Sequence, residues 1–310
     1  MILAVIDCGT NTFNLLIVEV NFTAYTKLFN TRIPVKLGEG TINKGFIDAV
    51  PFNRGMDALK EFKKYLVQFN VNKILAYATS AIRSAKNGMD FIEKSKTELG
   101  IDIVIIDGDR EAELIYLGNK VAARLKNDIA LIMDIGGGST EFILANGKEI
   151  FWKQSYLLGA ARLLEKFKVS DPITKQEIEE IDNYLTTELQ SLFEGIKLFP
   201  PSELVGSSGA FDSIIEMIHG EFNGEAISKE KICYEVDLTN YNKIANLVIS
   251  SSLAERKNIK GLIPMRFDMI VISSLLINFI LKTFPINKFL VSTYSLKEGA
   301  LVEFIEKNKS

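Results

Sequence analysis

The stretch Leu131-Ile-Met-Asp-Ile-Gly-Gly-Gly-Ser-Thr-Glu-Phe-Ile-Leu144 places three consecutive glycines between two apolar runs. Short apolar runs that are bounded by turn residues are typical of buried strands, so the stretch predicts a hairpin. Because glycine has no Cβ, an anion can approach the backbone N–H groups of such a turn closely. The alternative is an ordinary glycine-rich hairpin, and the flanking acids favour the phosphate-binding interpretation.

The side chains around this turn add further chemistry. Asp134 ends the incoming strand and Glu141 begins the outgoing one, while Ser139 and Thr140 supply hydroxyl donors. Two carboxylates beside an anion site could hold a hydrated Mg²⁺ or orient a water molecule. We therefore expect Asp134 and Glu141 to be both metal ligands and catalytic groups. The predicted phosphate contacts of the turn are Gly136, Gly137, Gly138 and Ser139.

The same pattern occurs near the beginning of the sequence, in Val5-Ile-Asp-Cys-Gly-Thr-Asn-Thr-Phe-Asn-Leu-Leu-Ile-Val18. Asp7 corresponds to Asp134, Gly9 to Gly136 and Thr12 to Ser139. A spacing of roughly 130 residues between the copies is too long for a solenoid repeat and suits one copy per domain. The predicted phosphate contacts of this first turn are Gly9, Thr10, Asn11 and Thr12.

The duplicated strand, acid, glycine turn and strand resemble the phosphate-loop pair of the actin, sugar-kinase and chaperone-ATPase superfamily. Within that superfamily the detail resembles the exopolyphosphatase and guanosine pentaphosphate phosphohydrolase (Ppx/GppA) family. The resemblance implies an α/β fold of two actin-like (ribonuclease H-like) domains, each a mixed sheet flanked by helices, with a cleft between them. We expect the domains to comprise residues 1–125 and 126–310, and the C-terminal helix 297–310 could pack back on the first.

Strands are expected over 73–78 and 101–106, and the segments at their ends resemble two further motifs of this family. In Ala78-Thr-Ser-Ala-Ile-Arg83 the resemblance implies that Arg83 contacts phosphate, although an arginine alone is often a surface ion pair. In Gly108-Asp-Arg-Glu-Ala-Glu-Leu-Ile-Tyr116 it implies that Glu111 is the catalytic base, although acids in a first helical turn also complement the helix dipole. This chain has Arg110 where family members often carry glutamate, which adds a cation beside the expected base.

A third small-residue turn occurs in Gly206-Ser-Ser-Gly-Ala210, between an expected strand and an expected helix. Such a turn presents amides and hydroxyls at a helix N-terminus, where anions bind readily. In Val291-Ser-Thr-Tyr-Ser-Leu-Lys-Glu-Gly-Ala-Leu301 the chain has Lys297 where family members commonly have arginine or lysine. These segments add predicted phosphate contacts at Gly206, Ser207, Ser208, Gly209 and Lys297.

Composition excludes several other classes. The chain has 310 residues, 47% of them hydrophobic, and a net charge of −3, which suits two globular domains and is a poor match to a duplex-DNA binder. The two cysteines, Cys8 and Cys233, form no metal-ligand spacing, and the sole histidine, His219, cannot build a histidine-based metal site. No Walker-type phosphate loop is present, and neither a signal peptide nor a membrane span is expected. We expect a cytoplasmic protein and leave open whether it is a homodimer.

The function that these residues and the resemblance together predict is Mg²⁺-dependent hydrolysis of a terminal phosphoanhydride bond, in which the resemblance implies that Glu111 accepts a proton from the attacking water. The expected substrates are inorganic polyphosphate and guanosine pentaphosphate, and short chains or nucleotides are favoured because the sequence ends at Ser310, before the extra C-terminal domain of longer family members. Two alternatives remain open. One is an ATP-dependent small-molecule kinase of the same superfamily, and the other is a non-catalytic sensor that binds guanosine tetraphosphate.

Overall fold

The computed structural model describes residues 1–22, 24–224, 228 and 230–308, so the last two residues of the expected C-terminal helix lie outside the described part. The strands of its first sheet are β1 Ile2–Cys8, β2 Thr12–Asn21, β3 Ala24–Pro34, β4 Lys73–Ala78 and β5 Val104–Ile105. Their order across the sheet is β3-β2-β1-β4-β5. Strands β1 to β3 form an antiparallel meander, and β4 and β5 run parallel to β1.

The second sheet repeats this topology. Its strands are β6 Ala130–Ile135, β7 Thr140–Ala145, β8 Ile150–Tyr156, β9 Glu203–Ser207, β10 Cys233–Glu235 and β11 Lys288–Ser292. Their order is β10-β11-β9-β6-β7-β8, in which β6 to β8 are an antiparallel meander and β9 and β11 run parallel to β6. Asp7 on β1 pairs with Asn14, and the corresponding Asp134 on β6 pairs with Glu141.

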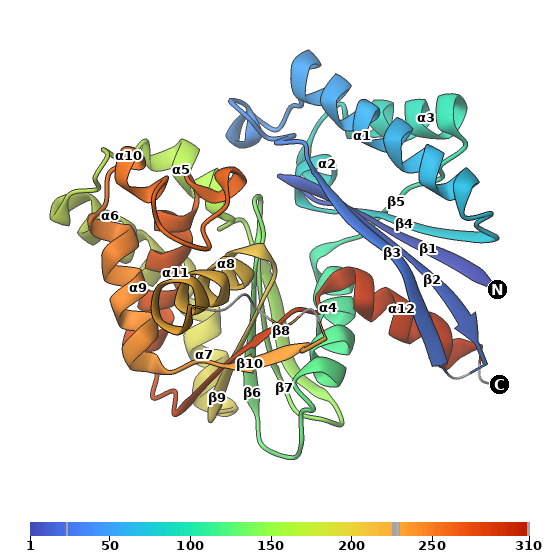
Figure 1. Ribbon diagram of the computed structural model, residues 1–310. Coiled ribbons are helices and arrows are strands. Elements are labelled where there is room, and N and C mark those ends of the chain that lie inside the picture. The colour runs from blue at the N-terminus through green and yellow to red at the C-terminus, as the bar shows by residue number, and fades with distance from the viewer. Residues whose placement is uncertain (23, 225–227, 229, 309–310) are drawn as a thin grey trace.

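Helices cover the outer face of each sheet, as Figure 1 shows. Alternate side chains of a strand point to opposite faces, so Ala4 and Ile6 of β1 contribute to the outer core of the first sheet. The elements on this side are η1 Ile42–Lys44, α1 Ala49–Gln68, α2 Ser80–Ser84 and α3 Gly88–Leu99. Helix α1 packs here because Met56, Leu59 and Phe62 recur at helical spacing on one face.

The larger helical layer covers the second sheet, where Leu131 and Met133 of β6 and Phe142 of β7 are buried. Tyr241 and Phe289 lie in the same core with their rings edge to face. The elements of this layer are α5 Ala160–Phe167, α6 Lys175–Glu188, α7 Gln190–Leu198, α8 Gly209–Ile218, η2 His219–Asn223, α9 Leu238–Ser250, α10 Leu253–Arg256, η3 Pro264–Arg266 and α11 Ile270–Thr283.

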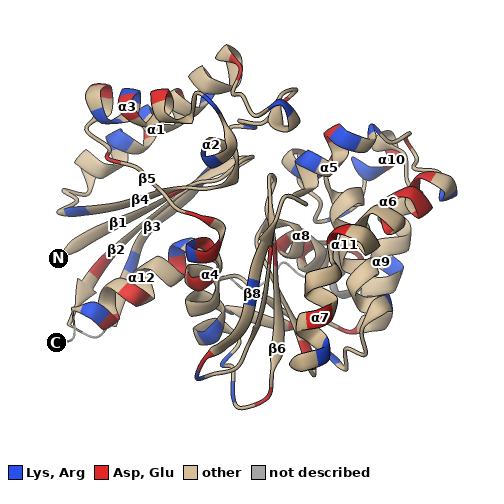
Figure 2. Cartoon of the chain, turned by 180° about the vertical axis from the view of Figure 1, so that it is seen from behind, with Lys and Arg blue, Asp and Glu red and all other residues tan. Residues whose placement is uncertain are grey.

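Two helices, α4 Gly108–Ala122 and α12 Leu296–Lys307, lie between the two sheets (Figure 1). A shared core joins Leu3 and Val5 of β1, Ile132 of β6 and the apolar sides of both helices. At the polar side of the pair, Arg110 forms ion pairs with Glu113 and Glu303. Figure 2 shows basic and acidic residues alternating along α4 and α12 in this region.

The α/β class with two mixed sheets is confirmed, and one local expectation is corrected. A strand was expected over 101–106, but only Val104–Ile105 pair with β4, while Ile101 and Ile103 are buried in the outer core without joining the ladder. Arg83 was expected just past the end of β4, and it lies there in the short helix α2. Among the described residues, no helix is long and apolar enough to cross a membrane.

Candidate active site

One cleft of about 1050 Å³ contains both glycine turns. Gly9 to Thr12 follow β1, and Gly136 to Ser139 follow β6, so each turn sits at the end of the first strand of its own sheet. All eight residues of the two turns line the cleft, as the duplicated sequence pattern predicted. The cleft is the place where a single anion could meet both turns.

The backbone of the second turn is held from behind by α5. The first amides of this helix donate to the turn: Ala160 to the carbonyl of Gly136 (2.9 Å) and Ala161 to that of Gly137 (3.0 Å). The Arg162 side chain adds a bond from Nε to the carbonyl of Gly138 (2.8 Å). In a trans peptide the C=O and the following N–H point in opposite directions. The N–H groups of residues 137–139 therefore point away from α5, on the side of the cleft.

The first turn is held in an equivalent way by the segment that follows β3. The amides of Val35 and Lys36 donate to the carbonyl of Asn11 (2.8 and 3.0 Å), and that of Leu37 donates to the carbonyl of Thr10 (2.7 Å). The same peptide geometry directs the N–H groups of Asn11 and Thr12 away from this segment. Two unrelated pieces of structure thus orient the two turns alike.

The first glycine of each turn is required by a close backbone approach. A Cβ at Gly9 would lie 2.9 Å from the carbonyl oxygen of Thr12, and one at Gly136 would lie 3.0 Å from that of Ser139. Real Cβ atoms rarely come so near to an oxygen of a tight turn. The sequence repeat between the two turns therefore reflects a repeated three-dimensional geometry.

Three carboxyl groups lie around the turns. Burial raises the pKa of Asp7 to about 6, although Lys297 and the Asn14 side chain, which donates to Asp7 Oδ2 (3.0 Å), lower it. Burial also raises the pKa of Asp134 and that of Glu141, the latter to about 7 with the Asp134 charge adding to the effect. Ser155 donates to Glu141 Oε1 (2.6 Å). Asp7 and Asp134 line the cleft, whereas Glu141, which is 1% exposed, is not among the lining residues.

The fourth carboxyl group is Glu111, in the first turn of α4. It lines the cleft and is 7% exposed. Burial raises the pKa of Glu111 well above its usual value, and Glu141 raises it further, against the opposing effect of Arg83. Arg83 Nη1 lies 2.7 Å from Glu111 Oε2 and also donates to the carbonyl of Ile106 (2.9 Å). Arg83 thus holds the carboxyl group in place and is not itself among the residues that line the cleft.

The residues of the third turn, after β9, lie in two different environments. Ser208 and Gly209 line the cleft at the start of α8, whereas Gly206 and Ser207 do not. Ser207 is fully buried and donates its hydroxyl to Asp134 Oδ2 (2.6 Å). Ser208 has a φ of 76°, a strained value for a residue with a side chain, and such strain concentrates at functional turns.

The segment before α12 brings further polar groups to the cleft. Ser295 donates to the same Asp134 oxygen as Ser207 does (2.6 Å) and caps the helix with Glu298. Lys297 lines the cleft and lies 2.9 Å from Glu298 Oε1. Burial opposes the charge of Lys297, but Glu298, Asp7 and other carboxylates outweigh this effect and raise its pKa. Lys297 is therefore a partly buried cation that interacts with acids of both halves.

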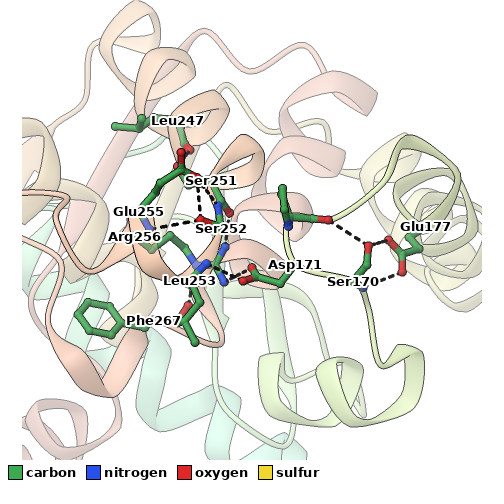
Figure 3. A network of polar contacts seen from close by, with 11 residues as sticks. Ser170, Asp171, Glu177, Leu247, Ser251, Ser252, Leu253, Glu255, Arg256 and Phe267 are labelled. Carbon is green, nitrogen blue, oxygen red and sulfur yellow. Dashed lines mark hydrogen bonds and ion pairs between the residues drawn. The ribbon is translucent and has the colours of Figure 1, made fainter.

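A polar network around Arg256, outside the cleft, supports the turn near Phe267. Arg256 is 5% exposed and lies between Asp171 and Phe267, as Figure 3 shows. Its Nη2 is 2.6 Å from Asp171 Oδ1, and its Nε donates to the carbonyl of Phe267 (3.0 Å). Arg266, which precedes Phe267, and Met269, two residues after it, line the cleft. The network therefore fixes the turn that carries them.

Sequence reasoning missed several residues of this arrangement. Asp7 was recognised as the counterpart of Asp134 but was not proposed as a site residue, although the repeat was sufficient to find it. Ser295 could have been noticed from the Ser-x-x-Glu capping pattern before an apolar run. Arg32 on β3 and Asp212 on α8, 3.6 Å apart at the cleft, carry no local signal, because only the fold brings them together.

Comparisons with known proteins agree with this arrangement. The family model described as the Ppx/GppA phosphatase family matches residues 16–308. A crystal structure of an exopolyphosphatase from Cytophaga hutchinsonii is 39% identical, with a TM-score of 0.96 over 99% of this chain and 98% of that one. The Aquifex aeolicus Ppx/GppA family member is 25% identical, with a TM-score of 0.83 over 100% and 99% of the two chains.

Among sequence relatives, a bifunctional 3-dehydroquinate synthase/phosphatase of Fusobacterium nucleatum subsp. nucleatum is 31% identical over 98% of this chain, which spans only 46% of that protein. Exopolyphosphatase 1 of Mycobacterium tuberculosis is 23% identical over 99% of this chain and 89% of its own length. The fold is accordingly the two-domain actin-like one that the duplicated turns implied. With a family model that covers nearly the whole sequence and a solved relative that superimposes almost end to end, this chain belongs to the Ppx/GppA phosphatase family.

Proposed function

We propose that the protein hydrolyses the terminal phosphoanhydride bond of inorganic polyphosphate, of guanosine pentaphosphate, or of both. The observation that carries the proposal is the pair of glycine turns whose N–H groups are directed to one cleft, with the buried carboxyl of Glu111 in the same cleft. Phosphoryl transfer requires mainly that the anion is neutralised and that a water molecule is held in line. Membership of a phosphatase family and likeness to exopolyphosphatases support this choice of reaction.

In this proposal the terminal phosphate binds to the amides and hydroxyls of the two turns, with Ser208, Gly209 and Lys297 completing the site. Glu111 acts as the general base, and Arg83 orients its carboxyl group. A base works best when its pKa lies near the working pH, and burial moves the pKa of Glu111 upward from the usual glutamate value. Gly206 and Ser207 do not line the cleft, and Ser207 acts indirectly, because its hydroxyl group donates to Asp134 Oδ2.

We further propose that Mg²⁺ takes part, held by Asp134 and by its counterpart Asp7. The donor set fits, since both residues offer carboxylate oxygens in the cleft, which are the ligands that Mg²⁺ prefers. No group of three or more His, Cys, Asp or Glu side chains among the described residues could hold a metal. This too fits Mg²⁺, which is commonly bound by one or two carboxylates together with phosphate oxygens and water. The bound cation would neutralise phosphate charge. Glu141, which pairs with Asp134 across β6 and β7, would act on the site indirectly, through the electrostatic interaction of the two carboxyl groups.

The test is phosphate release, measured with Mg²⁺ present against long polyphosphate, guanosine pentaphosphate, ATP and pyrophosphate. We expect release from polyphosphate or guanosine pentaphosphate and a strong loss of turnover in Glu111→Gln. The Glu113→Gln variant, two residues further along α4 and outside the cleft lining, is the matched control and should keep its activity. Tight nucleotide binding without phosphate release would instead indicate a sensor, and ATP-dependent phosphorylation of an acceptor would indicate a kinase.

A further inference from the structure

Arg162, on α5, connects the second glycine turn to the first half of the molecule. Its Nε donates to the carbonyl of Gly138 (2.8 Å), and its Nη1 donates to the carbonyl of Ile42 in η1 (3.0 Å). The side chain is 8% exposed, so both bonds are formed away from solvent. One planar guanidinium group therefore spans from the phosphate-binding turn of one sheet to a loop attached to the other.

Contacts from the opposite direction reinforce this bridge. Asn43 donates its side-chain amide to the carbonyl of Arg162 (3.1 Å), and its backbone N–H donates to Glu165 (3.4 Å). Burial lowers the pKa of Arg162, and its Nη2 has no hydrogen-bond partner within the described residues. The bridge thus leaves one nitrogen of a buried cation without a partner in the described part of the chain. A group kept at such a cost is better explained by a task than by stability alone.

The turn itself meets the first half on its other side. A Cβ at Gly138 would lie 2.6 Å from the hydroxyls of Thr10 and Ser80, and one at Gly137 would lie 2.3 Å from the Asn11 side chain. The position of the second turn is consequently set by contacts with the first half on both sides. A change in the spacing of the two halves would therefore alter the position of the Gly138 peptide.

We propose that Arg162 is a positioning residue that couples the approach of the two halves to the orientation of the Ser139 N–H group. The bond to the Gly138 carbonyl fixes the peptide between residues 138 and 139, and with it the direction in which the Ser139 N–H points. The bond to Ile42 exists only when η1 lies against α5. The phosphate site is therefore complete when the halves are together and incomplete when they separate.

This inference rests on the proposed function only in taking phosphate as the ligand of the turn. The experiment is amide hydrogen exchange of residues 42–45 and 136–140, with and without inorganic phosphate, in the unaltered chain and in three variants. Arg162→Met keeps the apolar stem and removes both bonds. Arg162→Lys keeps the charge, but an ammonium group cannot donate to the carbonyls of Gly138 and Ile42 in the fixed geometry of a guanidinium group. Lys166→Met, an exposed cation of the same helix, is the matched control.

In the ligand-free protein we expect Arg162→Met to raise exchange in both segments, and Lys166→Met to leave both unchanged. Phosphate should protect both segments in the unaltered chain, but only the turn in Arg162→Lys. In Arg162→Met the Ser139 N–H group should no longer be oriented to donate to phosphate. Affinity for inorganic phosphate should therefore fall on the order of tenfold, which is typical for the loss of a hydrogen bond to a charged group. In turnover assays the same variant should raise KM as well as lower kcat.

Several outcomes separate this inference from the proposed function. If inorganic phosphate does not bind the unaltered chain, the proposed function fails, while the ligand-free exchange still tests the bridge. If Arg162→Met alters only one of the two segments, or if phosphate still protects residues 42–45 in that variant, the coupling does not pass through Arg162 and the inference is wrong. Unfolding midpoints of all variants identify any general loss of structure.

Discussion

Glu141→Gln should make the stability of the protein less dependent on pH. Glu141 is almost fully buried, and burial together with the Asp134 charge raises its pKa from 4.5 to about 7. A carboxyl whose pKa is higher in the folded state stabilises that state below the unfolded pKa, and this stabilisation is lost as pH rises through the folded pKa. The whole rise corresponds to about 3 kcal/mol, most of which falls between pH 5 and pH 8.

The assay is the free energy of unfolding from urea titrations at intervals between pH 5 and pH 8. The unaltered chain should lose stability over this range, and Glu141→Gln should lose roughly 2 to 3 kcal/mol less, because glutamine does not titrate. Glu98→Gln, which removes an exposed carboxyl of α3, is the control and should follow the unaltered chain. Equal pH dependence in Glu141→Gln and the unaltered chain would refute the assignment of a raised pKa to this buried carboxyl.

The remaining predictions concern catalysis. Glu111→Gln should lower kcat by roughly 10² or more while inorganic phosphate still binds, as checked by steady-state kinetics and by titration calorimetry. Ser207→Ala removes one of the hydroxyl donors that lower the pKa of Asp134, so that pKa should rise further and the acidic limb of the pH–rate profile should move to higher pH. Hydrolysis of long polyphosphate should weaken more steeply with added salt than that of guanosine pentaphosphate, because a longer polyanion displaces more counterions, and KM values at low and high salt measure the difference.

Much of the fold could be predicted from the sequence, because the signals that define it are local. The apolar runs on both sides of each glycine turn give the hairpins, and the spacing of Met56, Leu59 and Phe62 gives the face of α1. The strand expected over 101–106 was too long, since burial of its isoleucines does not distinguish strand pairing from packing against helices. Apolar pattern predicts which residues are inside but not which backbone groups pair.

The glycine turns of the site were predictable, but the contacts that other residues make across the fold were not. The repeat was sufficient to find both glycine turns, and Glu111 was found through the family motif. The roles of Arg83 and Ser207 were not predictable, because each depends on a contact across the fold: Arg83 to Glu111, and Ser207 to Asp134. Both residues had been expected to touch phosphate, and in the structure each contacts a carboxyl group. Whether they also meet a substrate stays a prediction.

The placement of α12 constrains the order in which the chain can fold. Leu296, Ala300 and Leu301 of this last helix complete the same core as Leu3 and Val5 of the first strand. Synthesis proceeds from the N-terminus, and N-terminal domains usually fold first. Here the inward face of the first sheet keeps apolar side chains in water until residues near 300 have left the ribosome. The two halves must therefore mature together, and the first half is exposed to aggregation until α12 has been synthesised.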